Sequence, residues 1–376
     1  MRIDGIELYL VENPFHKPWR TAYGADPGNS VVIARLVSGE HEGWSEASPL
    51  PDPNYSYEYG RGAFEVCKRF LAPLVVGKEF ATARELNDTM RHVKGNPFAK
   101  AAIEMAWWTL KADIESKTLG QLLGAQTDKV KVGEGFGITD TVDELIESIG
   151  KSLDEGYDRV KLKVAPGWDE KVLEAVRSTF PNQTFHVDGN SAYRYHEHRD
   201  LLKRLDRFQL AMIEQPFQVG DIYYTAKLQE QLDTPICLDE TITEPWQAEV
   251  AAEMKACKYI NIKPARVGGL QNSLDINEIC RQAGIGCWVG GMLESDIGKA
   301  ICTELAAIPN MVYSHDITPA TGNYPYTITT RELVMTPDKM LYLAKETGTP
   351  VKPDIEKMLE KTVLTAKFGI CVGANG

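Results

Sequence analysis

Short apolar runs recur at a nearly constant interval through the middle of the chain, and five successive runs each end in an ionisable residue. The spacings between these end residues are 25, 26, 25 and 24 positions. Each run has the length of a strand and is followed by a turn and a helical segment, so the interval fits one β-strand plus one crossover helix. The residues that end the runs are Lys163, Asp188, Glu214, Asp239 and Lys263.

The same alternation extends on both sides of these runs and predicts eight strands. Eight equal units favour a closed, TIM-like (β/α) barrel over a single open parallel sheet. A barrel of this kind builds its active site at the C-terminal ends of its strands, which makes the five end residues candidate site residues. The predicted strands are Val130–Gly133, Arg159–Val164, Thr184–Asp188, Ala211–Glu214, Ile236–Asp239, Tyr259–Lys263, Gly286–Val289 and Met311–Ser314.

The two ends of the chain follow other patterns. Ile3–Val11 and Ser30–Val37 alternate as antiparallel strands do, and Lys100–Lys117 carries the apolar face of an amphipathic helix. From Tyr326 the pattern becomes irregular, with one helix predicted near Asp354–Ala366. We therefore predict an α+β capping domain over residues 1–125, a (β/α) barrel catalytic domain over 126–325, and a C-terminal segment over 326–376 that packs back on the capping domain and completes it.

Charge and cysteine usage exclude several functions. The composition is ordinary for a globular protein, with 43% hydrophobic and 25% charged residues. A net charge of −12 argues against binding to nucleic acid or an acidic membrane surface. Seven cysteines without CxxC spacing argue against a disulfide framework or a zinc site. The N-terminus lacks a signal-peptide pattern and no long apolar run is present, so we expect a cytoplasmic protein.

Three of the end residues form a candidate metal site. Asp188, Glu214 and Asp239 end successive strands and offer hard oxygen ligands, without accompanying cysteine or histidine ligands, which suits Mg²⁺ and also Mn²⁺. Such an ion keeps open positions that a substrate carboxylate would fill. A single acid at a strand end is explained as well by capping a helix or pairing with a basic residue, but three at matched positions favour a metal.

The lysines on either side of these acids are candidate acid/base catalysts. Lys161 and Lys163 are two residues apart on one strand and therefore point to the same face. If that face is the barrel interior, repulsion and desolvation would lower a lysine pKa and make one of the pair a usable base. A solvated lysine face is the alternative. Lys263 would stand across the barrel as a second acid/base, unless it only forms a salt bridge to a neighbouring acid.

Five further residues are candidates for supporting roles. Asn190 and Asn261 share the strand face of neighbouring site residues and would hydrogen-bond ligands or substrate, although Asn190 alternatively only shapes a turn. Glu240 directly follows a candidate metal ligand, so strand parity points it away from the barrel axis unless a turn brings it back. Glu294 and Asp316 lie just beyond the seventh and eighth strands, where each would touch substrate or orient a lysine.

Longer motifs resemble a known family. They are similar to the enolase superfamily, muconate-lactonizing-enzyme subgroup, and within it to o-succinylbenzoate synthases and N-succinylamino acid racemases. The resemblance implies Mg²⁺ on the three acids, Lys163 and Lys263 beside the reacting carbon, and capping-domain loops near Pro14–Gly24 and Ser48–Tyr57 that close over the site. The motifs are Lys161–Lys163, Met212–Pro216, Thr234–Glu240, Ile260–Gly269 and Gly290–Glu294.

The residues and the resemblance predict a metal-dependent enzyme that removes the proton α to the carboxylate of a small-molecule substrate. Lys163 is the expected base, and Lys263 is an acid on the opposite face in racemisation or a cationic stabiliser in dehydration. The expected reaction is racemisation of an N-acyl (succinyl) amino acid, dehydration to o-succinylbenzoate, or both. We also expect a homo-oligomer.

The sequence pattern is compatible with several other functions. Within the superfamily these are a muconate cycloisomerase and a dipeptide epimerase. The Asp-x-Asp that resemblance to dipeptide epimerases would require is replaced by Asp316-Ile-Thr, which weakens that second alternative. Outside the superfamily, a metal-dependent aldolase, a glycoside hydrolase or a non-enzymatic binding barrel would use the same fold. A hydrolase would need an acid pair without the two lysines.

Departures from the family pattern lie on the substrate side. Glu134 stands in the first strand where smaller or neutral residues are usual, and the stretch from Asp316 to Tyr324 lacks the arginine that the family usually shows. The capping loops are rich in aromatic residues. Among these, Trp19 and Tyr55 are predicted to set substrate preference.

Overall fold

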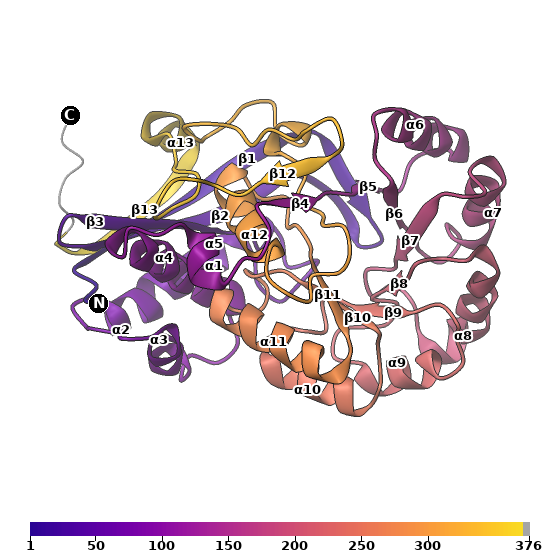
Figure 1. Cartoon of the computed structure of the whole chain (residues 1–376), viewed down its shortest axis with the longest axis horizontal. Helices are drawn as coiled ribbons and strands as arrows, with labels where there is room; N and C mark the ends of the chain where they lie inside the picture. Colours follow the sequence, from indigo (N-terminus) through magenta and orange to yellow (C-terminus); the bar gives the residue numbers. More distant parts are fainter. Residues whose placement is uncertain (371–376) are drawn as a thin grey trace.

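The computed structural model describes residues 1–370. A cap of sheet and helices lies beside a ring of strands surrounded by helices (Figure 1). The TIM-like (β/α) barrel with an α+β cap that the sequence predicts is therefore confirmed. The predicted C-terminal segment includes residues 371–376, which lie outside the described residues. No helix within residues 1–370 is both long and apolar enough to cross a membrane.

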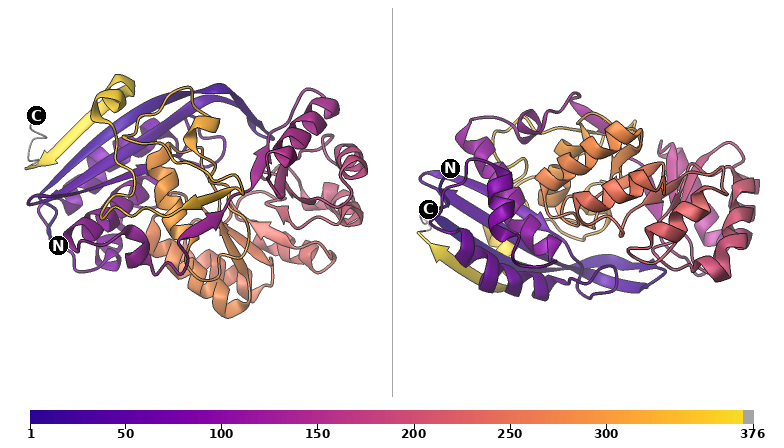
Figure 2. Two further views of the ribbon diagram at one scale, coloured as in Figure 1. Left: turned by 45° about the horizontal axis from the view of Figure 1, so that its top comes forward. Right: turned by 90° about the horizontal axis from the view of Figure 1, so that it is seen from below.

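The cap is built on a four-stranded antiparallel sheet in the order β13-β1-β2-β3. Its strands are β1 (Gly5–Thr21), β2 (Gly24–Ser38), β3 (His41–Ala47) and β13 (Thr362–Gly369). β1 and β2 form a long hairpin that extends from the cap to the barrel (Figure 2). The accompanying helices are α1 (Gly60–Val66), the π-helix η1 (Cys67–Leu71), α2 (Ala72–Val75), α3 (Ala83–Met90), α4 (Pro97–Ile114) and α5 (Leu119–Leu123).

The barrel contains a seven-stranded parallel sheet in the order β11-β10-β9-β8-β7-β6-β5. Its strands are β5 (Glu134–Phe136), β6 (Arg159–Lys163), β7 (Thr184–Asp188), β8 (Ile213–Glu214), β9 (Ile236–Leu238), β10 (Tyr259–Ile262) and β11 (Gly286–Val289). The helices that follow them are α6 (Val142–Asp154), α7 (Glu170–Thr179), α8 (Tyr195–Arg204), α9 (Ile222–Gln229), α10 (Pro245–Glu253), α11 (Leu270–Ala283) and α12 (Asp296–Ala306). Short helices η2 (Leu205–Phe208) and η3 (Ala320–Gly322) lie in the connections.

The barrel helices begin where the sequence supplies a capping side chain. At α6, the Thr141 hydroxyl accepts a hydrogen bond from the Glu144 N–H at 3.2 Å. This bond satisfies one of the N–H groups that lack a partner in the first turn. Leu145 and Ile149, four residues apart, then bury the apolar face of α6. The capping and the periodicity together place the helix on the outside of the sheet.

The ring closes through a segment that is not a regular strand, which corrects the prediction of an eighth strand over Met311–Ser314. Met311 forms an isolated parallel bridge with Cys287, and His315 forms another with Val132. The segment meets each neighbour through isolated bridges, so neither side forms a continuous ladder. The barrel is nevertheless joined all the way round by backbone hydrogen bonds such as His315 N–H to Lys131 O at 2.9 Å.

The predicted first strand, Val130–Gly133, is also displaced. β4 (Lys129–Lys131) pairs antiparallel with β12 (Met340–Tyr342), outside the parallel sheet. The strand that joins β6 is β5, which begins at Glu134. Residues 129–131 thus form a separate two-stranded ladder with β12, while Lys131 O and Val132 also contact the segment that closes the ring.

The helix predicted near Asp354–Ala366 ends earlier than expected. α13 covers only Ile355–Lys361, and β13 begins at Thr362. β13 pairs antiparallel with β1, from Gly369 opposite Gly5 onward. Pairing with an existing sheet overrides local helical propensity in this stretch, whose side chains alternate between exposed and half-buried as an edge strand requires.

Buried carboxylates fasten the cap to the barrel. Glu46 of β3 accepts hydrogen bonds from the Ser295 and Gly298 N–H groups, at the start of α12. Glu104 of α4 accepts from the Leu270 N–H at 2.7 Å, at the start of α11. A carboxylate is favourable at a helix N-terminus, where unpaired N–H groups point outward. These contacts fix the cap, and with it the β1–β2 hairpin, over the barrel.

We expect the free energy of unfolding of the metal-free protein to fall as pH rises from about 5 to 7. Burial raises the pKa of Glu58, Glu104 and Glu304 each to about 7. In this window the glutamates lose their protons in the unfolded chain but retain them in the folded protein. Each glutamate therefore lowers the free energy of unfolding by up to roughly 1.4 kcal/mol per pH unit. Thermal unfolding at several pH values measures the slope. Glu104→Gln cannot titrate and should flatten it, whereas an unchanged slope would count against this explanation.

Candidate active site

Three buried acids meet at one end of the barrel. Asp188 and Glu214 are the last residues of β7 and β8 and lie directly opposite each other in the parallel register. Asp239 follows β9. Each residue offers a carboxylate oxygen, and these atoms all lie within 4.8 Å of one another. Because all three side chains are fully buried, solvent screens the repulsion between their carboxylates only weakly.

This donor set fits a divalent cation. Burial, with the neighbouring charge of Asp188, raises the pKa of Glu214 to about 8, and a cation bound beside this carboxylate would favour its charged form. For Asp239, burial acts in the same direction, but the nearby cations Lys263 and Arg266 bring its pKa down to about 2. Three carboxylates without a sulfur or imidazole ligand match the preference of hard cations for oxygen. The three acids could therefore hold a divalent metal ion.

Lys161 occupies a different environment from the one the sequence suggests. Its Nζ lies 2.9 Å from Asp188, 2.8 Å from Glu214 and 3.1 Å from Asp316. Although burial acts to lower the pKa of Lys161, these carboxylates raise it well above its ordinary value. The expected repulsion between paired lysines thus does not govern this residue. Lys161 therefore stays positively charged and contacts two of the three clustered acids, Asp188 and Glu214.

Lys163 and Lys263 approach the cluster from two sides. Lys163 ends β6, and its Nζ lies 2.7 Å from Asp188. Lys263 follows β10, and its Nζ lies 2.9 Å from Asp239. The strands that carry the acids, β7 to β9, lie between these two strands in the sheet. Both amines line one cavity with Trp19 of the cap, so a molecule bound there would have an amine on each side.

The supporting asparagines bind the acids. Asn190 adopts a left-handed backbone conformation with φ of 39°, and its side-chain amide donates to Glu240 at 2.9 Å. It therefore both shapes the turn and holds a side chain of the site. The turn after β9 brings Glu240 back toward the cluster, where burial and Asp239 raise its pKa to about 8. Asn261 donates to Glu214 at 2.7 Å and thereby positions a candidate metal ligand.

The two acids beyond the last strands have different surroundings. Asp316 pairs with Arg159 at 2.6 Å as well as with Lys161, so it holds two buried cations in place. Glu294 accepts a hydrogen bond from the Met292 N–H at 2.9 Å. Both Asp316 and Glu294 line the cavity.

Arg266 is a buried part of the site that sequence reasoning did not single out. Its guanidinium pairs with Asp239 and donates to the Tyr55 hydroxyl at 3.3 Å. Arg266 stands three residues after Lys263, within the Ile260–Gly269 motif. The direction of its side chain depends on the turn after β10, in which the Val267 N–H bonds to Lys263 O at 3.1 Å. Strand periodicity does not predict this turn.

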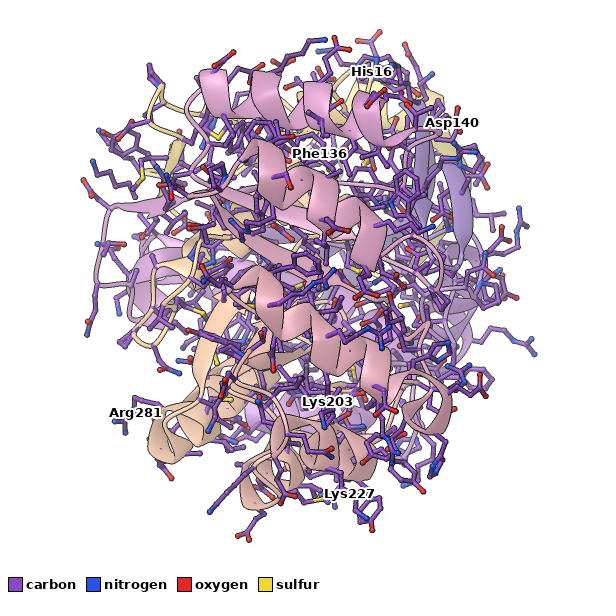
Figure 3. All side chains as sticks on the ribbon, turned by 90° about the vertical axis from the view of Figure 1, so that its right-hand side faces the viewer. His16, Phe136, Asp140, Lys203, Lys227 and Arg281 are labelled. Carbon is purple, nitrogen blue, oxygen red and sulfur yellow. The ribbon has the colours of Figure 1, made fainter. Side chains whose placement is uncertain are left out.

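The cap contributes the two residues that were predicted to set substrate preference, at different depths. Trp19 lies in the β1–β2 hairpin and lines the cavity. The hairpin meets the loop after β5, where Arg20 pairs with Asp140 near the side of the molecule that Figure 3 shows. Tyr55 reaches deeper, since its hydroxyl donates to Asp239 at 2.8 Å and accepts from Lys263 at 3.1 Å.

We expect Tyr55→Phe to slow exchange of the α-proton that faces Lys263 by about 10-fold or more. Burial and Asp239 raise the pKa of Tyr55 well above its ordinary value, so the hydroxyl stays protonated and ordered between Asp239 and Lys263. A hydrogen bond to a charged group is worth about 1.5–3 kcal/mol. Trp19→Ala should instead change the preference among substrate side chains. Exchange rates for both enantiomers in D₂O separate the two effects, and equal losses in both variants would refute the distinction.

Comparison with known proteins agrees with this geometry. The family description "Enolase C-terminal domain-like" matches residues 144–357, and "Mandelate racemase / muconate lactonizing enzyme, N-terminal domain" matches residues 5–124. The first match covers more than half of the chain. The chain belongs to the enolase superfamily.

Individual relatives extend over most of the chain. It is 36% identical over 330 residues to an N-succinylamino acid racemase from Amycolatopsis sp., covering 88% of this chain and 89% of the relative. It is 38% identical over 311 residues to an o-succinylbenzoate synthase from Listeria innocua, covering 82% and 83%. A crystal structure of an enolase-superfamily member from Listeria innocua matches with a TM-score of 0.93 at 35% identity, covering 98% and 99%.

These matches define the class of enzyme. With racemases and synthases among its relatives and a carboxylate cluster suited to a cation, the protein is a metal-dependent isomerase or lyase. Membership in the superfamily argues against the aldolase and glycoside hydrolase alternatives.

Proposed function

We propose that the protein racemises N-succinylamino acids by moving the proton α to the carboxylate. The observation that carries this proposal is the position of Lys163 and Lys263, which reach one cavity from the two strands that flank the acid-bearing strands. Each amine lies beside a different acid, at 2.7 Å from Asp188 and 2.9 Å from Asp239. Two opposed amines are what inversion at one carbon requires, since the proton leaves one face and returns on the other.

Each group of residues has a part in this reaction. Lys163 removes the proton of one enantiomer while Lys263 protonates the other face, and the roles exchange in the reverse direction. Lys161 and Asn261 hold the acid cluster in place. Asp188, Glu214 and Asp239 would hold Mg²⁺, with Mn²⁺ as a substitute. The cation would supply positive charge against the substrate carboxylate and the negative charge that develops there.

Dehydration to o-succinylbenzoate is a second candidate reaction of the same site. It is favoured by the Listeria innocua synthase, which aligns over 82% of this chain. Only one amine needs to act as a base in that reaction. The second, Lys263, would remain a buried cation held by Asp239 and Tyr55 and stabilise developing negative charge.

A paired assay tests both reactions. Purified protein with Mg²⁺ is incubated with N-succinyl-L-phenylalanine and followed by polarimetry, and with the cyclohexadiene precursor of o-succinylbenzoate and followed by ultraviolet absorbance. Loss of optical rotation supports the racemase, and a change of absorbance supports the synthase. Failure of both, with α-proton exchange also absent, would refute the proposed function.

A further inference from the structure

One wall of the cavity contains a further buried lysine. Lys299 lies in the first turn of α12, is only 3% exposed, and lines the same cavity as Lys163 and Lys263. Its Nζ donates to the carbonyl oxygen of Thr318. Within residues 1–370, no carboxylate forms an ion pair with this ammonium. A buried ammonium has three N–H donors to satisfy, and one backbone acceptor leaves it short of partners.

The nearest carboxylates are committed to backbone groups. Glu46 accepts from N–H groups at the start of α12 at 2.9 and 3.1 Å. Asp296 accepts hydrogen bonds from the Ala320 N–H at 2.9 Å and from the Leu333 N–H at 3.1 Å. Glu294 accepts from the Met292 N–H at 2.9 Å. Burial lowers the pKa of Lys299, and the charges of these acids oppose that shift without reversing it. None of the three acids forms an ion pair with the ammonium.

The position of Lys299 in the ring shows which part of a substrate would meet it. The acids lie on β7 to β9, on one side of the barrel. The opposite side consists of β11, the segment at 310–316 and β5. Lys299 lies in the first turn of α12, the helix after β11, and Thr318 follows the 310–316 segment. In a substrate whose α-carboxylate lay at the acid cluster, a group long enough to cross the cavity would meet Lys299.

We propose that Lys299 binds a second carboxylate, at the far end of the substrate's acyl group. The inference rests on the proposed function and specifies its substrate class as amino acids acylated by a dicarboxylic acid, of which succinyl is the four-carbon case. Lys299 already donates one hydrogen bond to the Thr318 carbonyl oxygen. The terminal carboxylate would accept hydrogen bonds from its remaining N–H groups. A neutral acyl group of equal length would leave the ammonium unsatisfied, so it would bind more weakly.

The test compares two substrates that differ only at the acyl terminus. N-succinyl- and N-butanoyl-L-phenylalanine have acyl groups of four carbons, and only the first ends in a carboxylate. For the wild-type enzyme with Mg²⁺, kcat/KM for α-proton exchange should be roughly 10- to 100-fold higher with the succinyl substrate, from the usual strength of a charge-assisted hydrogen bond. Lys299→Met should remove this preference by raising KM for the succinyl substrate while leaving the butanoyl substrate nearly unchanged. Lys299→Arg should retain the preference.

Controls separate this role from a structural one. Lys203→Met removes a positive charge from the exposed face of α8 (Figure 3) and should leave both substrates unaffected. If Lys299→Met impairs both substrates equally, or neither, Lys299 only supports the loop at Thr318 and the inference is overturned. If the wild-type enzyme exchanges neither substrate, the proposed function itself fails, and the inference fails with it. Exchange of both by the wild type without a preference overturns the inference alone.

Discussion

Racemisation should fall by about 10²–10⁴-fold when either Lys163 or Lys263 is replaced by alanine, which is the usual contribution of one general acid or base. The reason is geometric, since the two amines line one cavity from strands on either side of the acid-bearing strands. In the proposed reaction, each amine serves one face of the α-carbon. Polarimetry of N-succinyl-L-phenylalanine with each purified variant measures the loss.

The same pair of variants needs a control for charge and folding. Lys203→Ala removes a lysine from the surface of α8 and should racemise at the wild-type rate. Circular dichroism should show that both active-site variants keep the wild-type secondary structure. Full racemisation by Lys163→Ala or by Lys263→Ala would remove that residue from the proposed mechanism.

Removal of metal should abolish activity, and Glu214→Gln should lose metal binding without losing the fold. Burial and Asp188 raise the pKa of Glu214 to about 8, so at pH 7 the metal-free protein already favours an uncharged side chain there, which glutamine mimics. The metal-free variant should therefore unfold at a Tm no lower than that of the wild type. In the wild type, saturation at about 100 times Kd stabilises the fold by about 2.7 kcal/mol. That Mg²⁺-dependent rise in Tm should be largely absent in Glu214→Gln.

Two outcomes would contradict the metal site. The first is full turnover after exhaustive chelation, because the acid cluster would then not need a cation. The second is a wild-type Mg²⁺-dependent rise in Tm in Glu214→Gln. Restoration of activity by Mg²⁺, and by Mn²⁺ to a lesser or equal extent, should accompany recovery of the Tm shift in the wild-type protein.

The residues at the strand ends could be predicted because their position depends on one short-range rule. A strand, a helix and a turn repeat at nearly constant length, and the parallel register then brings Asp188 opposite Glu214 and Lys163 opposite Asp188. Strand parity also points Asn261 into the ring, where it binds Glu214. The acid cluster and its flanking lysines therefore follow from spacing alone.

Other parts of the site depend on contacts between distant segments. Tyr55 comes from the cap and reaches Asp239 only because the cap is fastened to the barrel by buried acids such as Glu104. Arg266 and Lys299 carry no periodic signal, and their partners are set by the turn after β10 and the loop that contains Thr318. The same reason explains the fold corrections, since β13 forms by pairing with β1, and the eighth segment is shared between two neighbours.

The central claim, that Lys163 and Lys263 serve opposite faces of one carbon, is tested most directly by ¹H NMR in D₂O. Each enantiomer of an N-succinylamino acid is incubated with Lys163→Ala and with Lys263→Ala, and loss of the α-proton signal is followed over time. The account predicts that each variant exchanges the α-proton of one enantiomer only, that the two variants prefer opposite enantiomers, and that inversion by either is at least about 10²-fold slower than in the wild type. Exchange of the same enantiomer by both variants, or inversion by either one at the wild-type rate, would contradict it.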